Sequence, residues 1–224
     1  MLFIVATPIG NLEDITLRAI NILNNADLIL AEDTRVTRVL LDRYNIKKDL
    51  ISYHQYSGFN KIDRIIDMLK DGKNLALVTD AGTPGISDPG GFLVSEVLKA
   101  VPDLKIVPIP GANAAIAALS ISGFPTDKFV FLGFPPHKKG RQTFFKKIKD
   151  IEETIVFYES KHRIVKALDN LRDLSLLGDR HIVICRELTK QFETIYRGTI
   201  DELLPKFKLD KNNLGEFIVV INEK

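Results

Sequence analysis

The sequence has only one cysteine, Cys185, and no tryptophan among its 224 residues. A lone thiol cannot form a disulfide within the chain, and the apolar neighbours of Cys185 in residues 181–186 indicate a buried strand. We therefore expect a packed, unreactive thiol rather than a nucleophile. No apolar run approaches the ~20 residues that a transmembrane helix needs. Residues 1–6 lack the basic start and cleavage site of a secretory signal. These absences predict a cytoplasmic protein with no membrane partner.

Several cofactor and metal motifs are also missing. The chain contains no Walker phosphate loop and no Gly-x-Gly of the dinucleotide fingerprint. Nicotinamide enzymes and the common Rossmann methyltransferases are therefore poorly supported. The histidines show neither the paired spacing nor the cysteines of a zinc site; they are His54, His137, His162 and His181. The sequence favours group transfer without a metal.

Short apolar runs alternate with helical patterns in the first half of the chain. This alternation predicts an α/β fold with a mainly parallel sheet covered on both faces. Apolar residues from Leu12 to Ala26 recur at helical spacing, so we expect a first helix there, capped by Asn11. The predicted strands are Leu2–Ala6, Leu28–Ala31, Leu50–Tyr53, Leu75–Thr79 and Lys105–Pro108.

A second α/β domain is expected after a break in the pattern. Two prolines and a glycine in residues 108–113, followed by an alanine-rich helix to about Ser120, suggest a hinge near 110–124. We expect domains at 1–112 and 113–224. The last three predicted strands follow with little helix between them, which favours a mixed sheet. The predicted strands are Phe129–Phe134, Thr154–Tyr158, His181–Arg186, Thr194–Arg197 and Glu216–Ile221.

Charge is unevenly distributed although the net charge is only +2. Residues 1–112 carry 12 Lys/Arg and 14 Asp/Glu, whereas residues 113–224 carry 19 and 15. Residues 128–149 contain seven basic side chains, five phenylalanines and no acidic side chain. Cations beside aromatic rings suit a phosphate backbone and unstacked bases. From charge alone, a solvated helix face over core phenylalanines is the stronger interpretation.

Three unusual loops follow predicted strands, where open α/β sheets bind ligands. Thr7-Pro-Ile-Gly-Asn11 follows the first strand, and its glycine would let a ligand approach the backbone. Ala31-Glu-Asp-Thr-Arg35 follows the second and carries two carboxylates. Adjacent strand residues point to opposite faces, so only one of Glu32 and Asp33 should face a ligand while the other caps the next helix.

The third loop is the strongest signal. Asp80-Ala-Gly-Thr-Pro-Gly-Ile-Ser-Asp-Pro-Gly-Gly91 has four glycines and two prolines in twelve residues, which cannot continue a helix or a strand. An ordinary connection has two to six residues. A loop of this composition is most easily explained if its backbone contacts a ligand.

Taken together, these loops resemble the tetrapyrrole methylase superfamily, and within it the RsmI type that modifies small-subunit ribosomal RNA. Phe157-Tyr-Glu-Ser160 and Arg186-Glu-Leu-Thr-Lys190 share in the likeness, which runs in order from residue 2 to about 221. The resemblance implies a class III methyltransferase of two α/β domains with a cofactor cleft between them. It further implies a homodimer that uses S-adenosyl-L-methionine as its cofactor.

The resemblance also implies a substrate and a set of contacts. The substrate would be a cytidine ribose in the decoding region of small-subunit (16S) ribosomal RNA, methylated at its 2′-hydroxyl and presented on an assembled small ribosomal subunit. The residues expected at the cofactor by motif position are Pro8, Asp80, Gly82, Thr83, Ile86, Asn113, Ala114 and Tyr158.

A 2′-hydroxyl is a weak nucleophile, so a positioned base should help to remove its proton. We expect Asp33 in that role rather than Glu32, with Arg35 holding it or a phosphate. Glu159, beside Tyr158, and Lys161 are rival candidates. For RNA, the resemblance favours contacts in the basic segment and at the start of the following helix. These expected RNA contacts are Lys138, Lys139, Arg141, His162 and Arg163.

Two alternatives stay open. One keeps the fold and changes the substrate, giving a tetrapyrrole or diphthine-type methyltransferase. The loop Thr7-Pro-Ile-Gly-Asn11 departs from the Gly-Pro-Gly-Asp-Pro form of the tetrapyrrole-modifying members, which argues against this alternative. The other alternative is a non-catalytic RNA-binding module with a vestigial cofactor site.

Overall fold

The computed structural model describes residues 1–54, 58–173, 177–209 and 214–224. The chain divides into two compact units, Met1–Asn113 and Ala114–Lys224, which are described separately. None of the helices in these described ranges is both long and apolar enough to cross a membrane.

The N-terminal unit is built on a five-stranded sheet in the order β3-β2-β4-β1-β5. Every neighbouring pair is parallel, which confirms the prediction from the alternating pattern. Parallel strands end at one edge of a sheet, so the loops that follow them meet there. The strands are β1 (Leu2–Val5), β2 (Leu28–Ala31), β3 (Leu50–Ser52), β4 (Leu75–Val78) and β5 (Ile106–Ile109).

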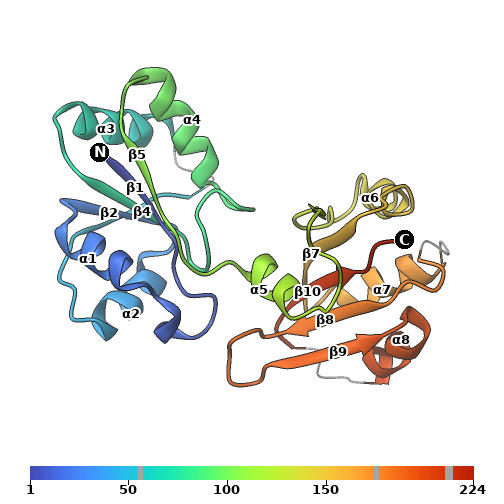
Figure 1. Cartoon of the computed structure of the whole chain (residues 1–224). Coiled ribbons are helices and arrows are strands. Elements are labelled where there is room, and N and C mark those ends of the chain that lie inside the picture. The colour runs from blue at the N-terminus through green and yellow to red at the C-terminus, as the bar shows by residue number, and fades with distance from the viewer. Residues whose placement is uncertain (55–57, 174–176, 210–213) are drawn as a thin grey trace. The chain divides into compact units, whose positions relative to one another are not determined.

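Helices cover both faces of this sheet (Figure 1). On one face, α1 (Leu17–Asn25) and α2 (Thr34–Arg43) pack through residues such as Leu23 and Leu41. On the other, α3 (Phe59–Lys70) and α4 (Gly90–Ala100) contribute a separate apolar cluster. Strands buried on both faces need continuous apolar sequence, and β4 is buried throughout its length.

The start of the first helix differs from the prediction. Asn11 caps only a short 3₁₀ turn, Leu12–Asp14, by accepting a hydrogen bond from the Glu13 amide. Helix α1 begins at Leu17, where the Thr16 hydroxyl accepts from the Ala19 amide. Two N-cap side chains lie close together in this sequence, so periodicity alone placed the helix start one turn too early.

The C-terminal unit has a mixed five-stranded sheet in the order β6-β7-β10-β8-β9, as the sequence predicted. The β6–β7 pair is parallel and the other pairs are antiparallel. Cys185 is fully buried in β8, which confirms the expectation of a packed thiol. The strands are β6 (Phe129–Phe131), β7 (Thr154–Ser160), β8 (Ile182–Arg186), β9 (Thr194–Gly198) and β10 (Glu216–Ile221).

Alternate residues of the central strands pack against three helices, α6 (Arg141–Ile148), α7 (Ile164–Asp173) and α8 (Ile200–Leu209). Helix α5 (Ala114–Ser120) contacts β7 and β10. The expectation of little helix between the last strands was wrong at one point. Helix α8 occupies the β9–β10 connection and buries Leu203, Leu204 and Phe207 in the core.

Candidate active site

Three loops at the carboxyl edge of the N-terminal sheet are joined by hydrogen bonds. An isolated antiparallel bridge links Thr7, after β1, to Gly82, after β4, through two N–H···O bonds of 2.9 and 3.0 Å. The Thr7 hydroxyl donates to the Thr79 carbonyl, and the Thr83 hydroxyl donates to the carbonyl of Ala112, after β5. These bonds connect the loops that follow β1, β4 and β5.

Glu32 and Asp33 occupy opposite environments, as their adjacency at a strand end requires. The Glu32 Oε2 atom accepts a 2.6 Å hydrogen bond from the Thr79 hydroxyl and lies 3.4 Å from the Asp80 amide nitrogen. Asp33 instead caps α2 by accepting from the Arg35 amide. The sequence prediction left the cap to Glu32, and this part was wrong, because Asp33 is the residue that caps α2.

The Asp33 carboxylate is stabilised in its charged form. The Arg35 guanidinium pairs with it at 2.6 Å, and this pairing together with the Arg35 amide lowers the pKa of Asp33 to about 2. A carboxylate so stabilised in its charged form is a weak base. Arg35 holds the Asp33 carboxylate, which is one of the two roles expected of it, while its own side chain is largely exposed.

The glycine-rich loop after β4 is organised by Asp88. Its Oδ1 atom accepts 2.7 Å hydrogen bonds from the amides of Gly85 and Gly90. Gly90 has no room for a side chain, because a Cβ atom there would lie 2.8 Å from the Gly85 nitrogen. Ser87 adopts a positive φ of 63°, which is uncommon outside glycine and often marks a functional loop.

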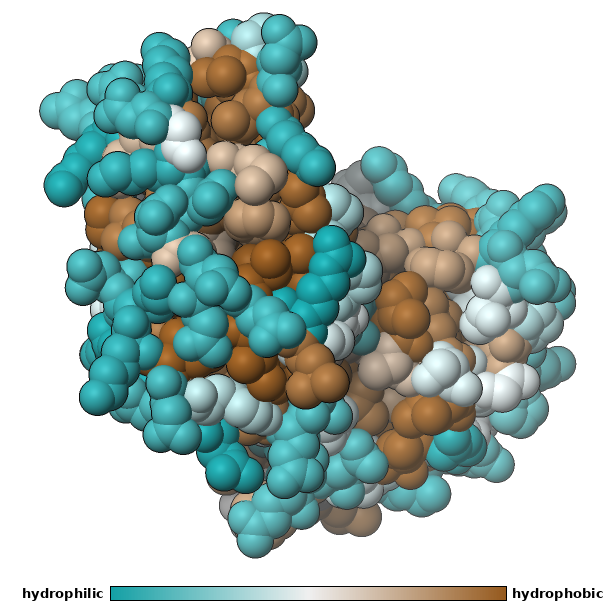
Figure 2. Space-filling model, turned by 60° about the vertical axis from the view of Figure 1, so that its left-hand side comes forward, coloured by the Kyte–Doolittle hydropathy of each residue, from teal (hydrophilic) through white to brown (hydrophobic). Residues whose placement is uncertain are grey.

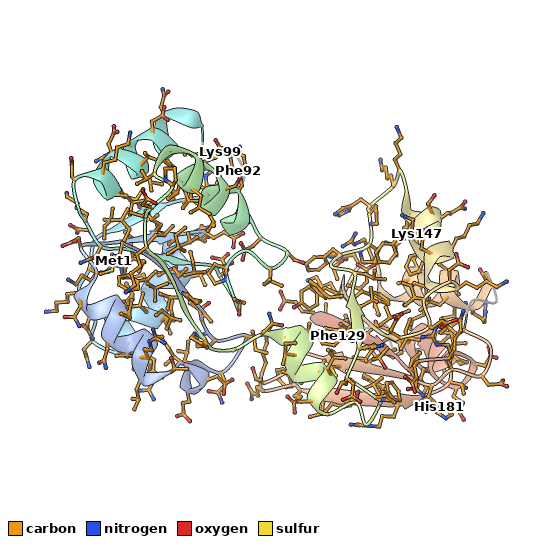
Figure 3. The ribbon with its side chains drawn as sticks, turned by 45° about the horizontal axis from the view of Figure 1, so that its top comes forward. Met1, Phe92, Lys99, Phe129, Lys147 and His181 are labelled. Carbon is orange, nitrogen blue, oxygen red and sulfur yellow. The ribbon has the colours of Figure 1, made fainter. Side chains whose placement is uncertain are left out.

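A hollow of about 670 Å³ opens beside this loop. Its lining comes from the end of β2, the glycine-rich loop and α4, and consists of Glu32, Ser87, Asp88, Pro89 and Phe92. Burial raises the pKa of Asp88, and the neighbouring Glu32 carboxylate adds to that rise. Figure 3 labels Phe92 on α4, where half of its surface is exposed.

Among the residues expected at the cofactor, those after β4 lie together in this loop. Asp80 is exposed and accepts a hydrogen bond from the Asp33 amide through Oδ1. Gly82 is buried with a φ of 84°, and Ile86 is 45% exposed. Pro8 is buried within the unit, directly after Thr7. The cofactor roles of these residues stay predictions.

Three further residues were expected at the cofactor, and they lie outside the glycine-rich loop. Asn113 is half-buried at the end of the N-terminal unit, and Ala114 begins α5. Tyr158 lies on β7, where its hydroxyl accepts a hydrogen bond from the Ala115 amide. Its ring packs at 5.1 Å from that of Phe131 and 5.2 Å from that of Phe134, the latter half-exposed. Their cofactor roles also stay predictions.

Glu159 lies in a setting that conflicts with the base role suggested for it. Its side chain has no exposed surface, and Arg141 and Arg163 pair with its two carboxylate oxygens at 3.0 and 2.9 Å. The Ser160 amide donates to the same carboxylate. A proton acceptor must reach its donor, whereas this carboxylate is unexposed and both of its oxygens already have partners, so the structure does not favour Glu159 as the base.

The expected RNA contacts fall into two groups. Lys138, Lys139 and His162 are exposed. Arg141 is 5% exposed and the Arg163 side chain 16% exposed, because both face Glu159. We therefore remove these two arginines from the set that could meet a phosphate directly. The exposed α6 cations Lys146 and Lys147, the latter labelled in Figure 3, extend the basic surface.

The Arg186–Lys190 motif forms the turn after β8. Glu187 and Thr189 both have positive φ, at 50° and 66°. Lys190 pairs with Glu187 at 3.1 Å and with Glu216 at 2.9 Å. Strain of this kind persists only where surrounding bonds hold it, so the motif encodes a fixed turn.

Asp88 and Phe92 are among the hollow's side chains that were not singled out from the sequence. Asp88 precedes Pro-Gly at a helix start, a pattern that could have marked it as a residue that binds loop amides. Phe92 gave no signal, because an aromatic residue in an amphipathic helix is usually core. Figure 2 shows hydrophobic side chains on the surface among hydrophilic ones, so exposure of a single large apolar residue is no marker by itself.

No group of three or more His, Cys, Asp or Glu side chains in the described ranges could hold a metal ion.

Comparison with known proteins gives a family match over most of the chain. The sequence model of the family of tetrapyrrole (corrin/porphyrin) methylases matches residues 1–204 of this chain. The chain belongs to this methylase family. A relative in Thermotoga maritima, named Ribosomal RNA small subunit methyltransferase I, is 46% identical over 223 residues that cover 100% of this chain and 98% of its own. A relative of the same name in Bacillus subtilis is 45% identical, covering 99% of this chain and 74% of its own. The resemblance drawn from the motifs is confirmed.

Solved structures with low sequence identity to this chain share its fold. Diphthine synthase superposes with a TM-score of 0.73 at 16% identity, over 99% of this chain and 89% of its own. Cobalt precorrin-4 methyltransferase gives 0.70 at 18% identity, over 99% and 94%. At identities of 16% and 18%, these superpositions show a shared fold and nothing more. They confirm the predicted α/β class of a tetrapyrrole methylase-like fold.

Proposed function

We propose that this chain transfers a methyl group from S-adenosylmethionine to the 2′-hydroxyl of a cytidine ribose in the decoding region of small-subunit ribosomal RNA. The observation that carries the proposal is the full-length similarity, at 44–47% identity, to proteins named Ribosomal RNA small subunit methyltransferase I. The ribose, the cytidine and the decoding region come from the resemblance of the motifs. The site supplies chemistry that suits them.

The charges at the carboxyl edge of the N-terminal sheet fit this cofactor. Glu32 and Asp88 line one hollow, and Asp80 is linked to Glu32 and to Asp33 by hydrogen bonds. A group of carboxylates repels a phosphate-bearing cofactor and attracts a cation. S-adenosylmethionine carries an ammonium and a sulfonium, and when bound it supplies an electrophilic methyl group. We propose that Asp80 and the Gly82–Thr83 backbone hold it.

We propose Glu32 as the group that accepts the hydroxyl proton. Glu32 lines the hollow, and the Thr79 hydroxyl fixes its carboxylate at 2.6 Å from Oε2. A base that is already oriented loses little freedom when the substrate arrives. Such a positioned base contributes about 10²–10⁴-fold to a rate.

We propose that the RNA contacts come from the exposed cations of the C-terminal unit. Lys138 and Lys139 follow Pro135-Pro136, and Lys146 and Lys147 lie on α6. The half-exposed ring of Phe134 precedes the same prolines and can stack on an unpaired base. Cations beside an aromatic ring combine phosphate and base contacts.

The decisive experiment uses small ribosomal subunits from cells that lack this enzyme. The protein is incubated with the subunits and with S-adenosylmethionine labelled in its methyl group, and the RNA is digested to nucleosides for mass spectrometry. Label in 2′-O-methylcytidine is the expected result. Label in another nucleoside would overturn the assigned position, and cofactor binding without label would overturn the substrate.

The alternatives give different outcomes in the same assay. A tetrapyrrole or diphthine-type enzyme would leave the RNA unlabelled and would methylate a porphyrinoid or protein acceptor. A non-catalytic RNA-binding module would bind subunits and transfer no label to any acceptor. A homodimer, a cytoplasmic location and an assembled subunit as substrate stay predictions.

A further inference from the structure

A buried ion-pair triad lies beneath the basic loop of the C-terminal unit. The Glu159 side chain has no exposed surface, and each of its oxygens pairs with a different arginine. Arg141 is the first residue of α6, the helix marked by Lys147 in Figure 3, and Arg163 immediately precedes α7. The carboxylate on β7 thereby joins the starts of two helices. We call Arg141, Glu159 and Arg163 the triad.

Both arginines extend beyond the carboxylate to the same short segment of backbone. The Arg141 Nη1 atom donates to the Pro136 carbonyl at 3.3 Å. The Arg163 Nη1 atom donates to the Pro135 carbonyl at 3.0 Å. Two consecutive carbonyls are thus held by two side chains that share one buried counter-ion.

The held segment leads directly into the exposed cations. Pro135 is buried and Pro136 half-buried, whereas His137, Lys138 and Lys139 are exposed. Proline fixes φ and has no N–H, so a Pro-Pro segment cannot anchor itself through backbone donors. Its carbonyls are its only backbone bonding groups, and the triad satisfies both. The lysines therefore project from an anchored stem.

Stability alone does not explain this arrangement. A buried ion pair often contributes no more stability than well-packed apolar residues of the same volume. Arg141 also stacks over the Phe145 ring at 5.0 Å and leaves its Nε atom without a partner, which an apolar side chain would avoid. The charged groups instead fix the position of the Pro135–Pro136 backbone, because only a fixed guanidinium can bind a carboxylate and a chosen carbonyl together.

We propose that the triad is a positioning device that holds the Lys138–Lys139 loop in the conformation that meets ribosomal RNA phosphates. The inference rests on the proposed function, since small-subunit RNA is the partner. An anchored loop loses less conformational freedom on binding than a loose one, and affinity gains by that difference. Glu159, Arg141 and Arg163 act on RNA through the lysines and do not touch it.

A double-mutant cycle tests this coupling. Glu159→Gln keeps the shape and removes the charge that binds both arginines. We expect it to weaken the affinity for purified small subunits about tenfold in the otherwise unchanged chain. In the Lys138→Ala/Lys139→Ala background the same change should weaken affinity less than about twofold, because the groups that it positions are gone. Binding is measured directly, without reference to methylation, at a temperature where melting curves show each variant folded.

A second triad variant keeps the proposal testable if Glu159→Gln does not fold. Arg163→Lys keeps the charge beside Glu159, but a single ammonium cannot reproduce the guanidinium contacts to Glu159 and Pro135 together. It should show the same non-additive loss of affinity. Arg180→Lys is the matched control. Arg180 is also buried and donates to the carbonyls of Ile151, Glu153 and Asn222, so its replacement should lower the melting temperature and leave subunit affinity unchanged.

The outcomes separate this inference from the proposed function. Equal losses from Glu159→Gln in both backgrounds would overturn the inference, even if the unchanged chain methylates subunits normally. Subunit affinity unaffected by the lysine replacements would also overturn it, because the loop would then have no RNA contact to position. Non-additive losses in a chain that binds subunits but transfers no methyl group would support the inference and overturn the proposed reaction.

Discussion

The Thr79 hydroxyl donates a 2.6 Å hydrogen bond to the Glu32 carboxylate across the paired ends of β4 and β2. The next residue, Asp33, turns away to cap α2. One strand end thus supplies one carboxylate to the hollow and one to the helix. This division assigns separate tasks to two neighbouring acidic residues and makes them a matched pair for mutation.

We expect Glu32→Gln to lower methyl transfer by about 10²-fold or more, since it removes the proposed proton acceptor and keeps its shape. Single-turnover rates on small subunits, with cofactor affinity measured separately by calorimetry, would show a loss of rate much larger than any loss of cofactor affinity. Asp33→Asn is the control. Asparagine still caps α2, so its rate should stay within about threefold of the unchanged chain. A slow Asp33→Asn beside a normal Glu32→Gln would contradict the assignment.

The backbone of the glycine-rich loop gives a second prediction. A Cβ atom on Gly90 would lie 2.8 Å from the Gly85 nitrogen, so Gly90→Ala must displace the loop. We expect a loss of about 1–3 kcal/mol in the free energy of unfolding and a weakened affinity for S-adenosylmethionine. Urea unfolding and calorimetry measure the two effects.

Gly91 offers an adjacent control with the opposite expectation. A Cβ atom there meets nothing closer than 3.8 Å. Alanine is the better helix former by about 1 kcal/mol, so Gly91→Ala should be neutral or stabilising. Equal destabilisation by both substitutions would show that helix α4, rather than the approach of Gly90 to Gly85, is what the mutations disturb.

The sequence predicted the elements well because hydrophobic patterning carries that information. Each of the ten predicted strands lies within a few residues of a strand in the described part of the chain, since runs such as Leu28–Ala31 must be apolar on both faces of a covered parallel sheet. Helix starts were harder to place. Asn11 and Thr16 are both good caps, and only the packing of α1 selects between them.

Roles of individual side chains were less predictable, because they depend on partners that are distant in the chain. Alternation showed that Glu32 and Asp33 must diverge, but the bond from Thr79, 47 residues away, fixes which one faces the hollow. Likewise, Arg141 and Arg163 belong to a basic pattern in the sequence that is typical of RNA-binding proteins. Glu159 lies 18 residues from Arg141, and that pairing turned both arginines inward.

The exposed lysines of the basic loop give a third prediction. Replacing Lys138 and Lys139 with alanine should weaken binding to small subunits and flatten its dependence on salt, by about one unit of slope for each phosphate that the variant no longer neutralises. Lys99→Ala is the control, because Lys99 is an exposed cation of α4 that pairs with Glu96 outside the basic segment. Affinities measured across a salt series would contradict the RNA interface if both variants kept the original slope.

The buried thiol gives a fourth prediction. Burial raises the pKa of Cys185 to about 11, so its reactive thiolate is scarce at ordinary pH and its sulfur is covered by β-sheet neighbours. Iodoacetamide at pH 8 should leave the folded chain unmodified and label Cys185 fully after unfolding in guanidinium. Rapid labelling of the folded chain would mean that β8 opens readily.

The same raised pKa makes stability depend on pH in a defined direction. The thiol is held neutral in the folded state, whose pKa is about 11 against an ordinary value of 9.0. The contribution of the thiol to the free energy of unfolding is therefore fully present below pH 9 and is lost as the pH rises toward 11. Between pH 8 and 10.5, the urea midpoint of the unchanged chain should fall further than that of Cys185→Ala, because lysine and tyrosine titrations are common to both and cancel in the comparison. Parallel declines would show that the thiol titrates alike in the folded and unfolded chains, and would contradict its burial in β8.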